Sequence, residues 1–396
     1  MKHEIKLTGF HRIVLGVLSA FGPLAMDLYL PGLPHIQREM HTSASMAQLT
    51  MTATLLGLAV GQAVLGPLSD RIGRKKIITA TVLLFAITSA LITQTMDIHV
   101  MIFYRFFQGI AGSAGIVLSL AMITDVFAGR ELTKNVTINQ TINGIFPVLA
   151  PMLGGVVMIY ADWQMNFWIL AGLGVVLFFS SFLLPETRTM DARQANKANA
   201  VKAYLHLFKQ REFMLYMVVQ TATMAALFSY IAGSAFVLER IFGLSTAQFG
   251  IVYAINGAGI ALMTMVSGRL AAKYGEQNSL GVFVGMASLG AVGLVLTLLL
   301  PKNLWLFLPP LFLVVASIGG NGGMTTSLAM AKQRANPGAA SALLGVMRYA
   351  VGGVISPVVG IFGATSYAPM ALLILGLELV AVMAYLLSRR LTRVNS

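Results

Sequence analysis

Four charged side chains stand inside long apolar runs of this chain: Asp27, Arg105, Arg348 and Glu378. A charge in the middle of a bilayer costs several kcal/mol unless it is paired or faces water. A carboxyl group can also bind and release a proton, because a neighbouring cation favours its ionised form and removal from water favours its neutral form. Asp27, with Arg105 as partner, is therefore predicted to take up and release a proton as its access to water changes.

The positions of Asp27 and Arg105 support this interpretation. Asp27 falls near the outer end of the first apolar run, one turn before Pro31. A carboxylate near a helix C-terminus opposes the helix dipole, which weakens the alternative that Asp27 is only an interfacial acid. Arg105 falls in the outer half of the fourth run. A purely structural arginine that bonds backbone carbonyls remains an alternative for it.

Arg348 and Glu378 fall near the middle of the last two apolar runs. If those runs are antiparallel neighbours, the two charges lie at the same depth, and a structural ion pair is the leading interpretation. The alternative places Arg348 on a substrate cavity, where it would repel cations or hold an electron-rich substrate.

Composition identifies the elements that must hold these charges. The chain has 396 residues, of which 57% are hydrophobic and 10% charged, whereas soluble domains average about 25% charged residues. A spanning helix needs roughly 20 apolar residues, and twelve such runs fill nearly the whole chain. The predicted spans are 10–30, 46–68, 77–96, 98–124, 136–160, 165–184, 213–237, 247–271, 278–300, 304–330, 338–362 and 368–388.

The basic residues predict the topology. The chain has 27 Lys and Arg residues and a net charge of +13, and nearly all of them fall in segments on one side of the predicted spans. Only Arg38, Arg240 and Lys302 fall on the other side. The positive-inside rule then places both termini in the cytoplasm, in an inner (cell) membrane. The excess charge is a topology signal and predicts no nucleic-acid partner.

A repeat divides the chain into halves. Gly66, Leu68, Arg71 and Gly73 follow the second span, and Gly268, Leu270, Lys273 and Gly275 follow the eighth at one constant offset of about half the chain. Four matches in register are typical of duplication. We expect six-helix bundles at 1–184 and 213–396, joined by a cytoplasmic linker at 185–212.

Three motifs carry further information. The loop after the second span reads Gly66-Pro67-Leu68-Ser69-Asp70-Arg71-Ile72-Gly73-Arg74-Lys75-Lys76, and it resembles the signature loop of the major facilitator superfamily. The fourth span carries Arg105 with Gln108 and Gly109, as in that family's span-4 motif for proton coupling. The fifth span reads Pro147-Val148-Leu149-Ala150-Pro151-Met152-Leu153-Gly154-Gly155, which resembles the antiporter motif of facilitator-family exporters, with Ala150 in place of a glycine. Two prolines bend a helix, and paired glycines allow close packing.

The resemblance implies roles for the loop residues. The acid at Asp70 would cap the start of span 11 in the outward-open state, and Arg74 would pair with Asp125 at the inner end of span 4. Gly66, Arg71 and Gly73 complete this conformational latch. Together with Asp27-Leu28-Tyr29-Leu30-Pro31 and Ala339-Ala340-Ser341-Ala342-Leu343, the motifs resemble the Bcr/CflA drug-resistance branch, which implies proton-coupled efflux of bicyclomycin-, sulfonamide- or chloramphenicol-like antibiotics.

Aromatic and amide side chains offer contacts for cargo. Apolar walls with a few polar groups suit small lipophilic or zwitterionic drugs. The candidates for a substrate cavity are Tyr29, Asn139, Asn143, Tyr230, Phe236, Tyr253, Asn256 and Arg348.

Three functions compete at this point. The first is a monomeric proton-coupled multidrug antiporter that works by alternating access, driven by the proton gradient without a cofactor. The second is a facilitator-family permease or exporter for a small metabolite, such as a sugar, a nucleoside or an amino-acid derivative. A membrane-embedded enzyme is disfavoured, because no span carries paired acids or a His-x-x-x-His pattern for metal chemistry, and the chain has no cysteine.

Overall fold

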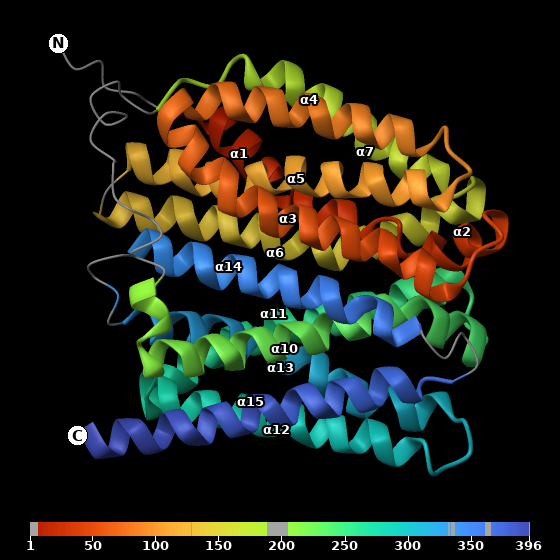
Figure 1. Cartoon of the computed structure of the whole chain (residues 1–396), viewed down its shortest axis with the longest axis vertical. Helices are drawn as coiled ribbons and strands as arrows, with labels where there is room; N and C mark the ends of the chain where they lie inside the picture. The colour runs from red at the N-terminus through yellow and green to blue at the C-terminus, as the bar shows by residue number, and fades with distance from the viewer. Residues whose placement is uncertain are drawn as a thin grey trace. The chain divides into compact units, whose positions relative to one another are not determined.

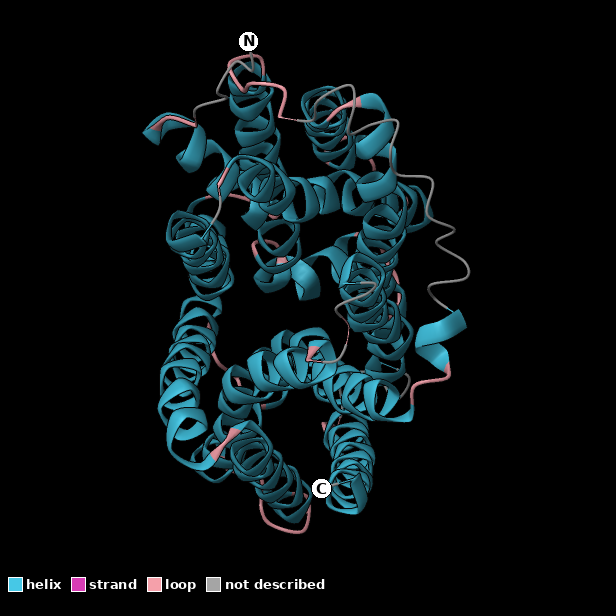
Figure 2. Ribbon diagram, turned by 90° about the vertical axis from the view of Figure 1, so that its left-hand side faces the viewer, coloured by secondary structure: helices cyan, strands magenta, loops and turns pink. Residues whose placement is uncertain are grey.

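The structure is a computed structural model that describes residues 7–127, 129–187, 205–331, 333, 337–360 and 366–395. Within these ranges all regular structure is helical, and Figure 2 shows helices and loops without a strand. The predicted all-α fold class is confirmed.

Twelve long helices occur in the described part of the chain (Figure 1). The first six are α1 (Gly9–Asp27), α3 (Ala44–Ile72), α4 (Arg74–Ile92), α5 (Ile98–Val126), α6 (Gly129–Tyr160) and α7 (Gln164–Ser181). The other six are α10 (Arg211–Ala235), α11 (Thr246–Tyr274), α12 (Glu276–Thr297), α13 (Leu304–Met330), α14 (Pro337–Ile355) and α15 (Ala368–Asn395). Each predicted span falls on one of these helices.

Most of these helices are long and apolar enough to cross a membrane. Eleven candidate spans of at least 18 residues occur among the described residues, and α6 contributes a shorter apolar stretch, Leu149–Tyr160. Large apolar side chains such as Phe179 and Leu289 are well exposed on the helices, as expected where lipid is the solvent. The chain is therefore a multi-pass membrane protein.

The first span is not one continuous α-helix, although the apolar segment runs from Gly9 to Glu39. The prediction of one helix over 10–30 is wrong at its end, because α1 stops at Asp27 and two short elements follow: the 3₁₀ turn η1 (Leu30–Gly32) and α2 (Leu33–Glu39). Pro31 and Pro34 stand in the first positions of these elements, where a missing N–H costs nothing. Asp27 is thereby the last residue of α1.

The chain divides into two compact units. The first comprises residues 1–42 and 49–198, and the second comprises residues 43–48 and 199–396. In the first unit α1 packs against α5 and α6, and α4 packs against α5 and α7. In the second unit α10 packs against α13 and α14, and α12 packs against α13 and α15. The same packing pattern thus recurs in each unit. Of the predicted linker at 185–212, residues 188–204 lie outside the described residues.

Small residues allow the helices of the first unit to approach closely. A Cβ atom added at Gly115 of α5 would overlap the carbonyl oxygen of Leu18 in α1, and one added at Gly112 would lie 3.2 Å from the Cα of Gly22. Without a hydrophobic driving force between helices in lipid, such close backbone contacts supply much of the packing energy. The crossing of α1 and α5 therefore depends on these glycines.

The close crossing of α1 and α5 predicts that one added methyl group lowers the stability of the protein at Gly115 but not at Gly172. Gly115→Ala should destabilise the protein by about 1–3 kcal/mol, because the methyl group meets backbone that cannot move aside. Gly172→Ala in α7 is the matched control, since nothing lies within 4 Å of its added Cβ. Thermal unfolding in detergent is the measurement. Equal melting temperatures for the two variants would contradict the predicted crossing.

Candidate functional site

Arg105 is fully buried, at 0% exposure, on the side of α5 that faces α1. Its Nη1 donates a hydrogen bond of 2.9 Å to the carbonyl oxygen of Ala25 in α1 and another to Oε1 of Gln108 one turn along α5. The Gln108 amide in turn donates to Oγ of Ser89 in α4 at 2.7 Å. A single buried hydrogen-bond chain thus joins α1, α5 and α4.

Two aromatic rings cover the Arg105 guanidinium. Its Cζ lies 4.2 Å from the ring centroid of Tyr29 and 5.6 Å from that of Phe167 in α7. The Tyr29 hydroxyl forms a hydrogen bond of 2.9 Å with Oγ1 of Thr50 in α3. A cation over an aromatic face gains up to about 2 kcal/mol when both groups are desolvated. Tyr29, predicted as a cavity residue, therefore helps to hold the arginine.

Asp27 lies beside this cluster, at the end of α1. Asp27 is buried, at 4% exposure, and ends α1 two residues after Ala25, whose carbonyl accepts from Arg105. Within the described residues the hydrogen bonds of Arg105 go to Ala25 and Gln108, and its Nε and Nη2 have no hydrogen-bond partner. The Ala25 carbonyl can accept from Arg105 because the last carbonyls of a helix lack a partner within the helix. Direct pairing of Asp27 with Arg105 stays a prediction.

The fifth-span motif brings α6 against the end of α1. A Cβ atom added at Gly154 would overlap the carbonyl oxygen of Leu28, the residue directly after Asp27. Pro151 and Gly155 are buried on the same helix. Gly154 therefore permits a backbone contact one residue from the predicted proton-binding acid.

The remaining predicted site residues on α6 are Asn139, Asn143 and Pro147. The Asn139 amide donates a hydrogen bond of 3.3 Å to the carbonyl oxygen of Leu15, so this cavity candidate bonds to the α1 backbone. The side chains of Asn143 and Pro147 lie outside the described part of α6.

The residues of the predicted latch surround Arg74 at the start of α4. Its guanidinium contacts Asp70 at 2.7 Å, Asp125 at 3.2 Å and Oγ of Ser69 at 2.6 Å. Gly73, which separates α3 from α4, has a φ of +117°, a conformation that favours glycine. The chain reversal at Gly73 is what turns Arg74 back toward Asp70.

Two residues of the α7 end join this network, and the motif analysis missed both. Glu186 accepts hydrogen bonds from the backbone N–H groups of Arg74 at 3.0 Å and Lys75 at 3.3 Å, and Thr187 donates to Asp125 at 3.0 Å. A carboxylate at a helix N-terminus satisfies unpaired N–H groups and complements the dipole. Gly73 at the N-cap of α4 has no side chain to do so. Glu186 follows the sixth span and is far in sequence from α4, so its residue type alone hardly indicates that it caps this helix.

Of the remaining latch residues, Gly66 packs near Val117 of α5, with 3.4 Å between an added Cβ and the valine Cγ1. Arg71 is exposed and suits the topological role of a basic loop residue.

Three cavity candidates of the second unit form one buried cluster. The rings of Tyr230 and Tyr253 stack with their centroids 5.6 Å apart, and the Asn256 amide donates to the Tyr230 hydroxyl at 3.0 Å. Phe236 begins the short π-helix η2 (Phe236–Ile241) and lies under Arg240, whose Cζ is 5.4 Å from the ring centroid.

The predicted ion pair between Arg348 and Glu378 is wrong. Both carboxylate oxygens of Glu378 and the Nε of Arg348 have no hydrogen-bond partner among the described residues, and no ion pair joins the two side chains. The prediction assumed that the last two spans are neighbours, but α14 packs against α10 and α13, whereas α15 packs against α10 and α12. Equal depth does not bring two side chains together when their helices are not packed against each other.

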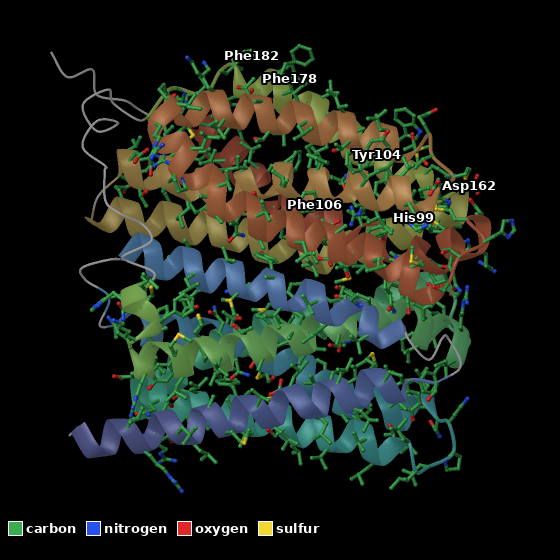
Figure 3. All side chains as sticks on the ribbon, in the orientation of Figure 1. His99, Tyr104, Phe106, Asp162, Phe178 and Phe182 are labelled. Atoms are coloured by element: carbon green, nitrogen blue, oxygen red, sulfur yellow. The ribbon has the colours of Figure 1, made fainter. Side chains whose placement is uncertain are left out.

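The first unit also carries His99 and Asp162, which lie near helix ends. Figure 3 labels Tyr104 and Phe106, which flank Arg105 on α5, and shows His99 and Asp162 toward one end of this unit. His99 stands in the first turn of α5, capped by Asp97. No cluster of three metal-ligating side chains occurs among the described residues.

The Major Facilitator Superfamily model matches residues 15–357. The chain therefore belongs to the major facilitator superfamily, a family of membrane transporters.

Curated relatives cover nearly the whole chain. The uncharacterized MFS-type transporter YdgK of Bacillus subtilis is 34% identical over 94% of this chain and 93% of its own length. A bicyclomycin resistance protein homolog of Haemophilus influenzae is 29% identical over 97% of each chain. The multidrug resistance protein MdtL of Escherichia coli is 28% identical over 82% of this chain and 81% of its own length. These names agree with the resemblance to the Bcr/CflA branch.

Solved structures show the same fold. A variant of the nucleoside transporter NupG matches with a TM-score of 0.75 at 16% identity, covering 95% of this chain and 99% of that one. The xylose transporter XylE from Escherichia coli matches with a TM-score of 0.69 at 15% identity, covering 95% and 96%. The chain thus has the twelve-helix fold expected from the resemblance.

The network around Arg74 predicts that replacing this arginine lowers the stability of the protein more than replacing Arg71 in the same loop. Arg74→Lys keeps the charge but loses the planar fork that reaches Asp70, Asp125 and Ser69 together, and it should cost about 1.5–3 kcal/mol of stability, the typical contribution of a hydrogen bond to a charged group. Arg71→Lys is the matched control because Arg71 is exposed. Thermal unfolding in detergent compares them, and an Arg74→Lys protein as stable as the control would refute the network.

Proposed function

We propose that this transporter is a proton-coupled exporter of small lipophilic or zwitterionic drugs that works as a monomer by alternating access. It would reside in the inner membrane with both termini in the cytoplasm, and the proton gradient would drive it without a cofactor. The observation that carries the proposal is the buried acid Asp27 at the end of α1, two residues from the Arg105 contact at Ala25.

The chemistry of this turn suits proton coupling. Asp27 is removed from water, which favours its neutral form, and it lies close in sequence to the carbonyl that holds the Arg105 guanidinium, which favours its ionised form. Opposed influences of this kind let a small change in water access decide whether the carboxyl binds a proton. Arg105 also retains two unpartnered donor atoms that an acceptor could use.

In the proposed cycle, the drug enters from the cytoplasm or the inner leaflet while Asp27 is ionised. Drug binding closes the inner side, and a proton taken up from outside at Asp27 neutralises the carboxylate. Neutralisation removes the attraction between Asp27 and Arg105 and so alters how the last turn of α1 is held against α5. The drug is then released outward, and loss of the proton to the cytoplasm resets the site.

The direction of transport rests on two supports. The fifth-span motif resembles that of facilitator-family exporters, and its Gly154 packs on the backbone next to Asp27. Relatives named for bicyclomycin resistance and multidrug resistance cover most or all of the chain. Both supports favour export of drugs over uptake of a metabolite.

A resistance profile tests the substrate class. Cells that express the protein should survive higher concentrations of at least one of bicyclomycin, chloramphenicol and a sulfonamide, and a proton uncoupler should abolish efflux of that drug. Unchanged susceptibility to the whole panel would favour the metabolite permease. Efflux that an uncoupler leaves intact would remove the proton from the mechanism.

Two variants test the residues. Asp27→Asn should abolish uphill efflux while the protein still folds, because an amide fills the same space but cannot exchange a proton. Arg105→Lys should reduce efflux by roughly 5-fold or more, within the usual range of coupling energies, since an ammonium group cannot reach Ala25 and Gln108 with the same fork. Efflux is measured in everted membrane vesicles with equal amounts of folded protein. Normal uphill efflux by Asp27→Asn would exclude Asp27 as the coupling acid.

A further inference from the structure

Glu378 is a carboxyl group buried in the interior of the second unit. It lies on α15 in a stripe of buried residues that also contains Ile374, Ala381 and Tyr385, and its exposure is 1%. Neither carboxylate oxygen has a hydrogen-bond partner among the described residues. The two neighbours in the stripe, Ile374 and Ala381, are apolar and offer it no side-chain polar atom.

Glu378 also lies far from water along the helix axis. The apolar segment of α15 runs from Ala368 to Leu391, so Glu378 lies about 15 Å along the helix from the segment's start at 1.5 Å per residue. That depth is the middle of a hydrocarbon layer about 30 Å thick. Tyr385, on the same stripe, donates from its hydroxyl to the Gln277 carbonyl of α12 at 3.2 Å. A Cβ added at Gly233 of α10 would lie 2.9 Å from the sulfur of Met370. Tight contacts therefore close the stripe on both sides of Glu378.

Charged groups that could compensate an ionised carboxylate lie toward the helix ends. Among the side chains that the structure describes, the titratable and charged groups on α15 and on the elements packed against it are Arg211, Glu212, Tyr216 and Tyr230 of α10, Glu276 of α12, and Tyr385, Arg389 and Arg390 of α15. The short 3₁₀ element η3 (Ser356–Gly360) has none. Arg389 is about 16 Å along the helix from Glu378, and it contacts Asn278.

An ionised carboxylate without a partner in such a place is far more costly than a neutral acid, because the lost hydration of a charge is not replaced. We propose that Glu378 is a proton-binding site of the second unit, separate from Asp27, whose proton keeps α15 packed against α10 and α12. The ligand is a single proton. Ionisation of the carboxyl requires water to reach it, and therefore requires this packing to open.

Linkage gives the direction of the pH effect. The packed form holds a proton on Glu378, whereas an unfolded glutamate loses it above about pH 4.3. The unfolded form then binds fewer protons, so the stability that Glu378 contributes falls as the pH rises. The unfolding equilibrium constant of the wild type should rise by up to about tenfold per pH unit relative to a variant that cannot ionise at this position.

Infrared spectroscopy of the full-length protein in detergent or lipid detects the proton directly. The carbonyl stretch of a protonated carboxylic acid should be present in the wild type at neutral pH and reduced in Glu378→Gln by the contribution of one carboxyl group. Glu276→Gln is the matched control, because Glu276 is partly exposed and accepts a hydrogen bond from Ser327, and its spectrum should keep the band. A Glu378→Gln spectrum with the full wild-type band would overturn the proposal.

Thermal unfolding between about pH 5 and pH 8 tests the role of the proton in packing. The melting temperature of the wild type should fall relative to that of Glu378→Gln as the pH rises, while Glu276→Gln should follow the wild type. A difference between wild type and Glu378→Gln that does not change with pH would overturn the proposal. If Glu378→Gln fails to fold, Glu378→Asp keeps the acid, and the infrared band must then persist in it; its absence would also overturn the proposal.

Discussion

The first unit is organised around a guanidinium that has no access to water. Arg105 is completely buried in a helix that crosses the membrane, and removing such a group from water costs several kcal/mol unless its charge and donors are compensated. The compensation comes from four other helices or turns: the Ala25 carbonyl of α1, the Gln108–Ser89 link to α4, and the rings of Tyr29 and Phe167. Each of these contacts fixes an element whose position would otherwise depend only on apolar packing.

Close backbone packing is the second constraint, and it acts at the same place. Gly109, next to Gln108, admits no Cβ because the Thr54 carbonyl of α3 lies against it, and Gly154 meets the Leu28 carbonyl of α1. Arg105 therefore acts on the end of α1 from one side and the α6 backbone from another. Asp27 lies between these two contacts in sequence. A change of charge at this residue is well placed to alter how α1 meets both neighbours, which is the physical content of the proposed coupling.

Much of the fold was predictable from the sequence because lipid imposes simple rules. Apolar runs of sufficient length must be helices, since a backbone in lipid has to satisfy its own hydrogen bonds, and all twelve predicted runs fall on helices. The pairing of Arg74 with Asp125 followed from the family resemblance of the loop, and the structure has this contact. The contact of Arg74 with Asp70 was not expected, and the cap of Asp70 on span 11 stays a prediction. Pro31 and Pro34 could have indicated that the first helix breaks after Asp27, but the long apolar run suggested one continuous helix.

The contacts that the sequence did not reveal depend on which helices become neighbours in the fold. Depth along a span can be counted, so Arg348 and Glu378 were placed at one level, but α14 packs against α10 and α13 while α15 packs against α10 and α12. The hydrogen bond of Arg105 to the Ala25 carbonyl, two residues from Asp27, likewise could not be read from residue types. Glu186 escaped notice because its partners, the N–H groups of α4, carry no side-chain signature.

The central claim is that drug and proton move in opposite directions through one protein, and proton counterflow tests it most directly. Purified protein in liposomes is given a gradient of the drug to which it confers resistance, without a pH gradient, and the internal pH is followed with a trapped indicator. The account predicts that drug moving down its gradient drives protons the opposite way, and that Asp27→Asn liposomes show no such proton movement. Drug movement by the wild type without any change in internal pH would contradict it.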